Sequence, residues 1–426
     1  MLSAYLSSRP HRAAAVTPPR TRGRQTATGL YVLVVLTFGA YLPSALYPGY
    51  QEVFGVGDLT MTLIYAVFAL VSAPALVLLG PASDALGARP VLLSGIALAA
   101  AGSACFALAP SAGWLLLGRA AQGLALGAAT GAAAVLISDG SARGPRHGAV
   151  LTSIAFVAGT ACGAMAGGVL AQYAPAPTVL PFVLHLALLA LGWWGVHTLA
   201  PSPAARAGMR RYRPTAPRIP RGMRAVFCTA SAVGFLAWTA AGLFLAIIPA
   251  LLEGSGQTDM AVTGGILGAV LVFSALAQPL VPRLGPRTSQ LIGLTGLLAS
   301  FALLAPTSGG STALTLAAAV VAGVGHGLAY AGAAAAIDAR TPAEARGAVT
   351  GALYPAFYLG SGVPAVAVGL LTLRYPLATA TSAVTAFAAA LVVLTGLAVV
   401  RVDRRPRVPT RVVARQRTRP VRESRL

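Results

Sequence analysis

Uninterrupted apolar blocks of about 20 residues recur along the chain and restrict its fold more than any other feature. As an α-helix, a block of this length crosses roughly 30 Å of hydrocarbon. Because a bilayer interior holds no water to bond exposed backbone groups, such segments must be helical. Charged residues make up 10% of the chain, against about 25% in soluble domains. We therefore expect an integral membrane protein built of helices.

Twelve spans are expected, in two sets of six separated by a polar segment rich in proline and arginine. The first set is Thr28–Tyr47, Leu59–Leu79, Pro90–Ala109, Gly113–Ser138, Gly148–Tyr173 and Val179–Leu199. The second set is Ala225–Leu251, Met260–Val281, Gln290–Ala305, Thr312–Ile337, Gly347–Leu371 and Pro376–Val400. The predicted fold is all-α, with twelve transmembrane helices in two six-helix bundles.

The predicted domains follow this division. They are an N-terminal tail (1–27), an N-terminal bundle (28–199), a basic linker (200–224), a C-terminal bundle (225–400) and a basic C-terminal tail (401–426). The first 24 residues are arginine-rich and free of acids, like a transit peptide. No short apolar core with a cleavage site follows them, so a tail held near anionic headgroups is favoured.

The distribution of arginine predicts the orientation. All 31 Lys and Arg positions are arginine, and the net charge is +21. Such a charge can indicate nucleic-acid binding, but these arginines lie between apolar blocks, so nucleic acid is not expected as a partner. With the N-terminus in the cytoplasm, 29 of the 31 lie on the cytoplasmic side, all but Arg119 and Arg374. The positive-inside rule predicts a cell-membrane protein with both termini cytoplasmic and anionic lipids at that face.

Acidic residues avoid the middle of every predicted span. Four fall in two outside loops, Glu52, Asp58, Glu253 and Asp259, and the other six lie on the cytoplasmic side. The three cysteines have no metal-ligand or disulfide spacing, and nucleotide-binding signatures are absent. No cofactor, no metal and no enzymatic activity are expected.

The two halves of the sequence repeat each other at an offset of 198 to 199 residues. Leu86–Arg89 matches Leu284–Arg287, Asp139 matches Asp338, and Gly148–Val150 matches Gly347–Val349. Each match falls at a corresponding end of a predicted helix. Two repeated six-helix halves are typical of secondary transporters, whose substrate path lies between the halves.

Three motifs resemble signatures of the major facilitator superfamily. The first is the loop between the second and third spans, with Gly80, Asp84, Gly87 and Arg89. In the family this acid is thought to latch the two halves together on the cytoplasmic side, here opposite the start of the eleventh span beside Arg346. Alanines at positions 85 and 88 replace the basic residues usual in the signature, a departure that concerns the strength of the latch and not its position.

The second motif is Arg119-Ala-Ala-Gln122-Gly123 in the fourth span, which is similar to the R-x-x-Q-G motif of the family. An arginine inside a membrane costs at least ~2.5–3.5 kcal/mol, so it must face the interior and find acceptors. Gln122 shares its face one turn on. The resemblance implies a charge on the translocation path, coupled to protons or to anion binding. A structural arginine that bonds backbone carbonyls is the alternative.

The third motif is a set of glycines in the fifth span, Gly159, Gly163, Gly167 and Gly168. The first three recur every four residues and predict a groove against which another helix packs closely. The pattern resembles an antiporter signature, although Ala164 replaces its proline. Simple close packing explains the spacing equally well.

Histidines and aromatic residues complete the candidate path. His326 and Tyr330 share one face of the tenth span, and an imidazole there can carry a proton. His185 in the sixth span is expected instead to hydrogen-bond across helices. Aromatic residues inside spans form a candidate apolar pocket or interfacial anchors. These residues are Tyr41, Trp238, Tyr330, Tyr354 and Tyr358.

Together the motifs resemble twelve-helix drug and metabolite exporters of the superfamily. The resemblance implies a monomeric secondary transporter that exports a small-molecule substrate by alternating access, driven by protons. The missing mid-span carboxylate is the main objection to proton coupling, because the proton must then travel on His326, a helix-end acid or the substrate. An uptake symporter or uniporter of the same fold is the alternative, and a membrane receptor is a further one.

Overall fold

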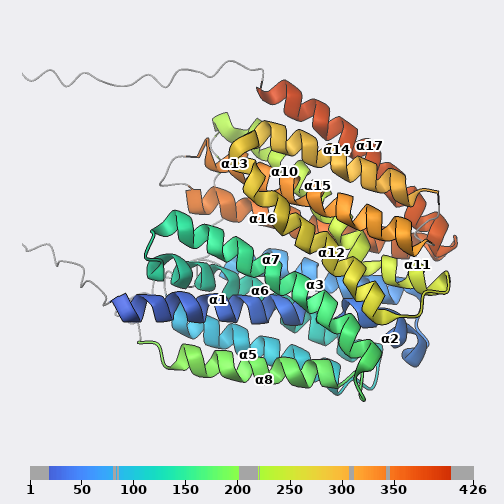
Figure 1. Ribbon diagram of the computed structural model, residues 1–426, viewed down its shortest axis with the longest axis horizontal. Coiled ribbons are helices and arrows are strands. Elements are labelled where there is room, and N and C mark those ends of the chain that lie inside the picture. Colours follow the sequence, from blue (N-terminus) through green and yellow to red (C-terminus); the bar gives the residue numbers. More distant parts are fainter. Residues whose placement is uncertain are drawn as a thin grey trace, which may run out of the picture.

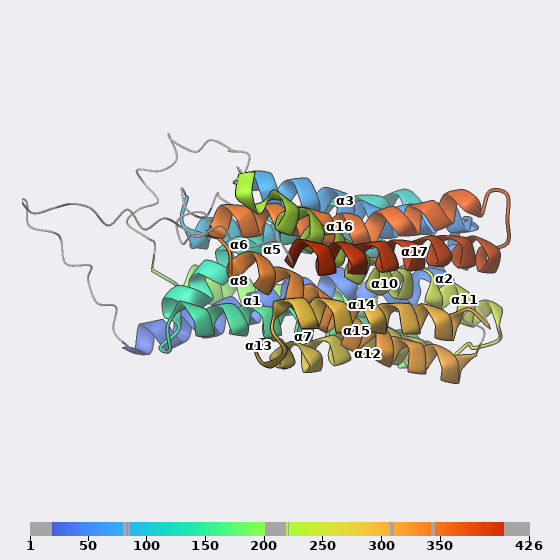
Figure 2. The same cartoon turned by 90° about the horizontal axis from the view of Figure 1, so that it is seen from above.

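The computed structural model describes residues 19–79, 83, 86–200, 219, 221–306, 311–341 and 346–403. Every regular element within these residues is a helix (Figures 1 and 2). Twelve helices or helix series are long and apolar enough to cross a membrane. The prediction of an all-α fold with twelve transmembrane helices is therefore confirmed.

The helices fall into two halves that follow each other along the chain. The first half contains α1 (Pro19–Tyr41), the 3-10 turn η1 (Leu42–Leu46), α2 (Tyr47–Phe54), α3 (Asp58–Leu79), α5 (Ala88–Ala107), α6 (Ala112–Gly140), α7 (Pro145–Tyr173) and α8 (Leu180–His197). The second half contains η2 (Arg221–Met223), α10 (Arg224–Ala246), α11 (Ile248–Gly254), α12 (Met260–Ala277), η3 (Gln278–Leu280), α13 (Val281–Leu284), α14 (Pro286–Leu304), α15 (Thr312–Asp338), α16 (Arg346–Leu371) and α17 (Leu377–Asp403). In Figure 1 the two halves lie one above the other.

The first span differs most from its predicted bounds. The helix begins at Pro19 instead of Thr28, because its polar start packs against the ends of neighbouring helices. The Arg24 guanidinium donates to Thr198 Oγ1 at 2.7 Å, and Thr26 lies against Gly140. A span prediction based on hydropathy contains no information on such polar contacts, so these residues were predicted to belong to the N-terminal tail.

Two inner helices run through the centre of the molecule. In the most apolar stretch of the first inner span, α1 with α2, 78% of residues are buried, and the share is 89% for the second, α10 with α11. The corresponding shares are 22% for α17 and 33% for α8, which lie at the outside of the bundles. Proline stands at the start of each element after a break, Pro43 in η1 and Pro48 in α2 of the first inner span, and Pro249 in α11 of the second. Because proline removes a backbone donor and crowds the preceding turn, each helix breaks there.

The halves meet along two pairs of helices. α3 packs on α16 along one side and α7 packs on α12 along the other, as the view in Figure 2 shows. At both contacts a glycine lets the backbones approach. Gly168 of α7 lies against Met260 and Gly264, and Gly369 of α16 lies against Leu59 and Thr62. The contact of α3 with α16 and the contact of α7 with α12 therefore resemble each other, as expected for two halves related by the sequence repeat.

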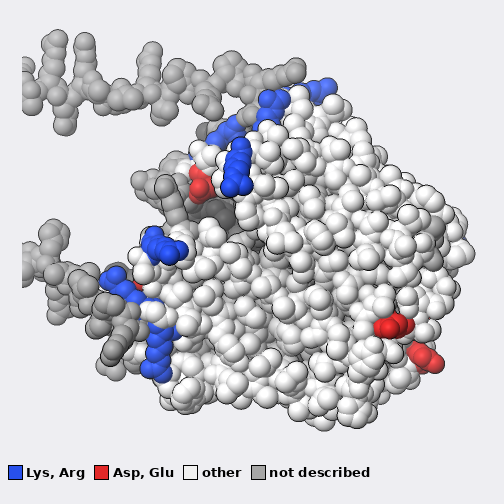
Figure 3. All heavy atoms as spheres, in the orientation of Figure 1, with Lys and Arg blue, Asp and Glu red and all other residues white. Residues whose placement is uncertain are grey.

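Charge distinguishes the two ends of the molecule. Apart from the buried Arg119 and from Arg374, described arginine side chains gather at one end, where α5, α7 and α14 begin (Figure 3). The outside loops predicted from the sequence, with Glu52, Asp58, Glu253 and Asp259, lie at the other. We call these the arginine-rich end and the acidic end. Every residue of 39–48 and 236–249 is buried, so both inner spans are enclosed from their middle towards the acidic end.

Gly87 and Gly285, matched in the repeat, adopt the same unusual backbone conformation. Their φ and ψ angles are 83° and 155° for Gly87, and 78° and 158° for Gly285. Each residue precedes a helix at the arginine-rich end, α5 and α14 respectively. Residues with a side chain rarely adopt this region, so both turns depend on glycine.

We predict that Gly285→Ala lowers the stability of the protein by about 1–3 kcal/mol. A Cβ at Gly285 meets nothing within 4 Å, so the cost comes from the positive φ alone. Gly351→Ala is the matched control, because that site has equal room within helix α16. The midpoint of thermal unfolding in detergent is expected to fall for the first variant and to hold or rise for the second. Equal midpoints would contradict the backbone argument.

Candidate functional site

Arg119 is fully enclosed near the centre of the molecule, with 1% of its surface exposed. Its Nη1 donates to the carbonyl oxygen of Ala40 and to Gln122 Oε1, the latter at 3.0 Å. Gln122 Nε2 donates in turn to the carbonyl oxygen of Gly39 at 3.2 Å. The two side chains lie one turn apart on α6, as their spacing predicted. They bond the backbone of α1 just before its break, where the inner span changes from α-helix to 3-10 turn.

Aromatic rings of α3 cover the guanidinium. The Phe68 ring lies 4.4 Å from Arg119 Cζ and the Tyr65 ring lies 5.9 Å away. Stacking on a ring face suits the weakly hydrated guanidinium and offsets part of its burial cost. Gly123 supports this arrangement, because a Cβ there would overlap the Phe68 carbonyl oxygen and hold α3 away. Arg119 is thus held by uncharged groups of three helices.

His326 occupies a comparable place in the second half. Its Nδ1 shares a 2.8 Å hydrogen bond with Ser274 Oγ of α12, and 1% of the residue is exposed. The Trp238 ring of α10 meets it edge-on at 4.9 Å, and the Tyr330 ring stacks on it at 5.7 Å. His326 Nε2 has no hydrogen-bond partner. The predicted pair His326 and Tyr330 therefore packs together on the inner helix α10.

Aromatic side chains connect the two halves in a layer between Arg119 and His326. Phe68 meets Tyr358 at 6.2 Å across the interface, and Tyr41 meets Phe68 at 5.9 Å. On the far side Phe357 contacts Tyr330 at 5.2 Å and Tyr354 at 5.5 Å. We call the following residues the central layer. They are Tyr41, Tyr47, Tyr65, Phe68, Arg119, Gln122, Trp238, His326, Tyr330, Tyr354, Phe357 and Tyr358.

Sequence reasoning identified part of this layer and missed Tyr47, Tyr65, Phe68 and Phe357. Tyr65 and Phe68 are one turn apart on α3, a spacing that puts two rings on one helical face. That spacing could have predicted that one face of α3 carries aromatic side chains. The identity of the facing helix, α16, is not contained in it.

One hydrogen bond crosses between the halves inside the central layer. The hydroxyl groups of Tyr65 in α3 and Ser361 in α16 lie 2.6 Å apart, and both residues are buried. Gly362, next to Ser361, lies against Ala66 and Ala69 of α3. A polar contact at such a close crossing favours the arrangement in which the acidic end is closed.

Tyr65→Phe is therefore expected to shift the balance towards opening of the acidic end by about two- to tenfold, the worth of one buried hydrogen bond. Spin labels at Leu108 and Leu373 report this, since both residues are exposed at that end in different halves. Ser361→Ala should shift the balance equally, and the double variant should add nothing. Fully additive effects would show that the two hydroxyl groups act independently.

His185 has a structural environment. Its Nδ1 shares a 2.6 Å hydrogen bond with Ser103 of α5, and its Nε2 lies 3.0 Å from the Val35 carbonyl oxygen of α1. Both ring nitrogens are thus used in joining helices of the first half. This agrees with the expectation that His185 bonds across helices.

The predicted latch loop is described only in part, because Gly80 and Asp84 lie outside the described residues. Gly87 makes the turn into α5, and its N–H donates to the Ser83 carbonyl oxygen at 2.9 Å. Arg89 Nη2 donates to the His197 carbonyl oxygen at 2.8 Å. Arg89 therefore binds the end of α8 within its own half, where a cation complements the helix dipole.

The glycines of α7 face two different neighbours. Gly159, Gly163 and Gly167 lie against the backbone of the first span, at Val34, Phe38 and Leu42 respectively. Gly168 points to the other half and meets Met260 and Gly264 of α12. One helix thus packs closely on the inner span of its own half and on the opposite half.

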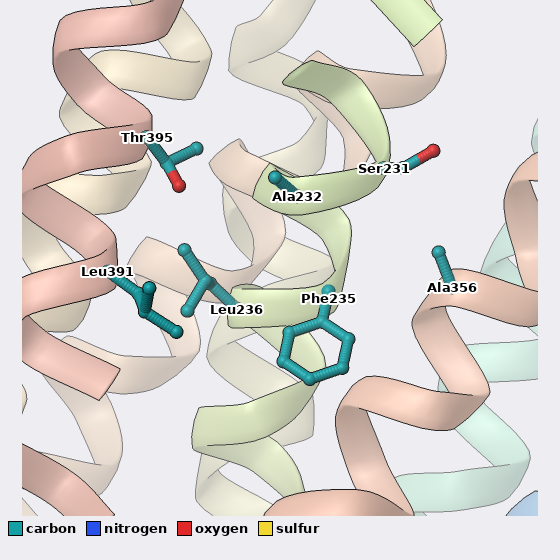
Figure 4. A pocket seen from close by; sticks show the side chains of 7 residues that line it. All are labelled: Ser231, Ala232, Phe235, Leu236, Ala356, Leu391 and Thr395. Carbon is teal, nitrogen blue, oxygen red and sulfur yellow. The ribbon is translucent and has the colours of Figure 1, made fainter. Parts of the chain in front are cut away.

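Two cavities in the second half lie away from the central layer. They have volumes of about 300 and 330 Å³ and lie between α10, α16 and α17. Figure 4 shows the first, with Ser231, Leu236 and Thr395 among its lining side chains. Their linings are almost wholly apolar and include none of the predicted site residues. α17 is the least enclosed span, so we do not place the substrate there.

Comparison with known proteins identifies the family. Residues 29–365 and 232–423 match the model of the Major Facilitator Superfamily. The chain belongs to the major facilitator superfamily. This membership agrees with the twelve spans and with the motifs around Arg119, and it makes the chain a transporter and not an enzyme.

Solved transporter structures share the fold of this superfamily member. A bacterial homolog of the human lysosomal transporter Spinster, inward-facing and unoccupied, has a TM-score of 0.68 at 14% identity, with 90% of this chain and 99% of that chain covered. The nucleoside transporter NupG has a TM-score of 0.68 at 16% identity, covering 89% and 99%. A POT family transporter in complex with 5-aminolevulinic acid has a TM-score of 0.71 at 12% identity, covering 92% and 98%.

Proposed function

We propose that this superfamily transporter exports a small molecule by alternating access, with the central layer as its binding site. The two halves would rock about this layer so that it opens to one end at a time. The observation that carries the proposal is the place of Arg119. It is buried at the junction of α1, α3 and α6, and the ring that covers it contacts the opposite half.

The proposed orientation rests on the arginines. With the arginine-rich end in the cytoplasm, both termini and the linker also lie there, near anionic lipids. The present arrangement is enclosed towards the acidic end, which is then the outside. Tyr330, Tyr354 and Tyr358 of the central layer stay half-buried. We propose that a solute from the cytoplasm meets these tyrosines first.

Rocking needs helices that slide closely past each other. The glycines Gly159, Gly163 and Gly167 give α7 such a contact with α1, and Gly168 gives it one with the other half. On the cytoplasmic side we propose that the loop with Asp84 meets the start of α16, as the family motif implies. The chain would act as a monomer, because one chain supplies both halves of the site.

Proton coupling is assigned to His326. The acids at described positions all lie near helix ends, so no carboxylate is placed in the central layer. His326 is buried within that layer and its Nε2 is without a partner, which leaves one nitrogen available for a proton. A POT family transporter of the same fold was solved in complex with 5-aminolevulinic acid.

Transport by His326→Gln in proteoliposomes tests this assignment. Glutamine keeps a polar group beside Ser274 but cannot change charge near neutral pH. We expect solute counterflow to persist while movement driven by a pH gradient is lost. His197→Gln is the control, because that residue is exposed at the end of α8. Unchanged coupling of solute movement to the pH gradient in His326→Gln would remove His326 from the mechanism. Separately, net movement of the solute from the outside face to the cytoplasmic face would favour an uptake transporter.

Counterflow itself separates a carrier from a receptor. A carrier exchanges labelled solute across the membrane without any gradient, because its site faces each side in turn. A receptor that binds the same solute shows no exchange. The first result supports the proposed function and the second rejects it.

A further inference from the structure

We infer that the central layer takes an organic anion, a carboxylate or similar acceptor group on a flat apolar body. This inference rests on the proposed function, since it names the substrate class of that site. It draws on three properties of the layer: unpartnered donors, an uncompensated positive charge and aromatic surfaces.

Four buried polar atoms of the central layer lack a hydrogen-bond partner. They are Arg119 Nε, Trp238 Nε1, His326 Nε2 and the Tyr47 hydroxyl. Exposure of these residues is 1%, 8%, 1% and 3% respectively. Buried polar atoms without partners are rare in native proteins because each costs free energy. Their gathering in one layer indicates a ligand that supplies the missing partners.

The unpartnered atoms are mostly donors. Arginine Nε and tryptophan Nε1 can only donate, and a tyrosine hydroxyl or an imidazole nitrogen can also do so. A matching ligand group must therefore accept hydrogen bonds. A carboxylate accepts up to about four and is the group that arginine binds best.

The charge of the central layer also favours an anionic ligand. Arg119 is bonded to the Ala40 carbonyl oxygen and the Gln122 amide, neither of which carries charge. Among the described acids, none lies within this layer, since all occur near helix ends. An uncompensated guanidinium in a poorly hydrated interior attracts an anion and repels a cation. Aromatic rings alone favour cations as well, so the arginine decides between the two classes.

The aromatic rings define the rest of the ligand. Phe68, Tyr330 and Phe357 offer ring faces and edges on both halves, which suit a flat apolar body. Two of these rings now cover the polar atoms, Phe68 over Arg119 and Tyr330 against His326. A ligand body that takes the place of a ring would bring its acceptor group to the donors beneath.

A matched set of ligands tests the inference on the full chain in detergent. The set is 4-nitrobenzoate, the neutral 4-nitrobenzamide and the cationic 4-nitrobenzylammonium, which share one flat body that quenches tryptophan. Phenylalanine at positions 114, 193 and 194 leaves Trp238 as the reporter, and those three tryptophans are exposed. We expect saturable quenching by the anion at a concentration at least about tenfold lower than by the other two.

Arg119→Gln should raise the concentration of anion needed for half-maximal quenching to about that of the amide, with Arg374→Gln as control. The comparison among the three ligands uses the unaltered site, so it tests the preference for an anion even if Arg119→Gln does not fold. Equal binding of all three, preference for the ammonium ion or no saturable quenching would each overturn the inference. If the anion binds but shows no counterflow, the proposed function fails while the ligand class stands. If a cation is carried, the ligand class fails while transport stands.

Discussion

Arg119→Ala is expected to reduce transport at least ~10-fold, because a hydrogen bond from this charged group to the substrate contributes about 1.5–3 kcal/mol. The change also leaves the Gln122 Oε1 atom and the Ala40 carbonyl oxygen unpaired inside the membrane. Counterflow in proteoliposomes measures the loss, normalised to the amount of folded protein. Arg374→Ala is the control, because that arginine is exposed at the acidic end.

Arg119→Lys separates charge from geometry. Lysine keeps the positive charge but lacks the planar group that bonds two acceptors and stacks under Phe68. Transport is expected to fall between the rates of the original chain and the alanine variant. A lysine variant with full activity would show that charge alone matters. Full activity in Arg119→Ala would leave Arg119 with a packing role only.

Gly163→Val is expected to destabilise the first half by about 1–3 kcal/mol or more, as overpacking does at a close contact. A Cβ at position 163 would overlap the Phe38 carbonyl oxygen, which is backbone and cannot turn aside. α7 must then move away from α1, which loosens the close contact that Gly159, Gly163 and Gly167 make with that helix. The midpoint of thermal unfolding and the folded yield in detergent measure the effect.

Gly265→Val on α12 is the matched control for this packing. No atom lies within 4 Å of a Cβ at Gly265, so the added side chain has room. Valine is also the better helix former of the two residues, so the replacement itself is expected to cost little or nothing. If the two variants unfold at the same temperature, the close contact of α7 with α1 does not contribute as described.

Much of the fold could be predicted because the bilayer imposes its own rules on the sequence. Apolar length placed the spans, and α12, α15 and α16 each begin within one residue of the predicted start. The spacing of Arg119 and Gln122 correctly put both on one face. The helix period is local, so a single sequence contains this information.

Contacts between helices could not be predicted in this way. Tyr65 meets Ser361 and Phe68 meets Tyr358 only because α3 packs on α16, far away in the sequence. The early start of α1 likewise depends on polar contacts with α6 and α8. One signal was overlooked: Pro43, Pro48 and Pro249 lie just after the breaks in the two inner spans.

Two distances measured in the same sample test alternating access most directly. Spin labels at Leu108 and Leu373 span the halves at the acidic end, and labels at Ala142 and Leu284 span them at the arginine-rich end, all at exposed positions. Cys105, Cys162 and Cys228 are first replaced by serine. When pH or a bound ligand shifts the populations, one distance should lengthen as the other shortens. Distances that stay fixed, or that change together, would contradict rocking of the two halves about the central layer.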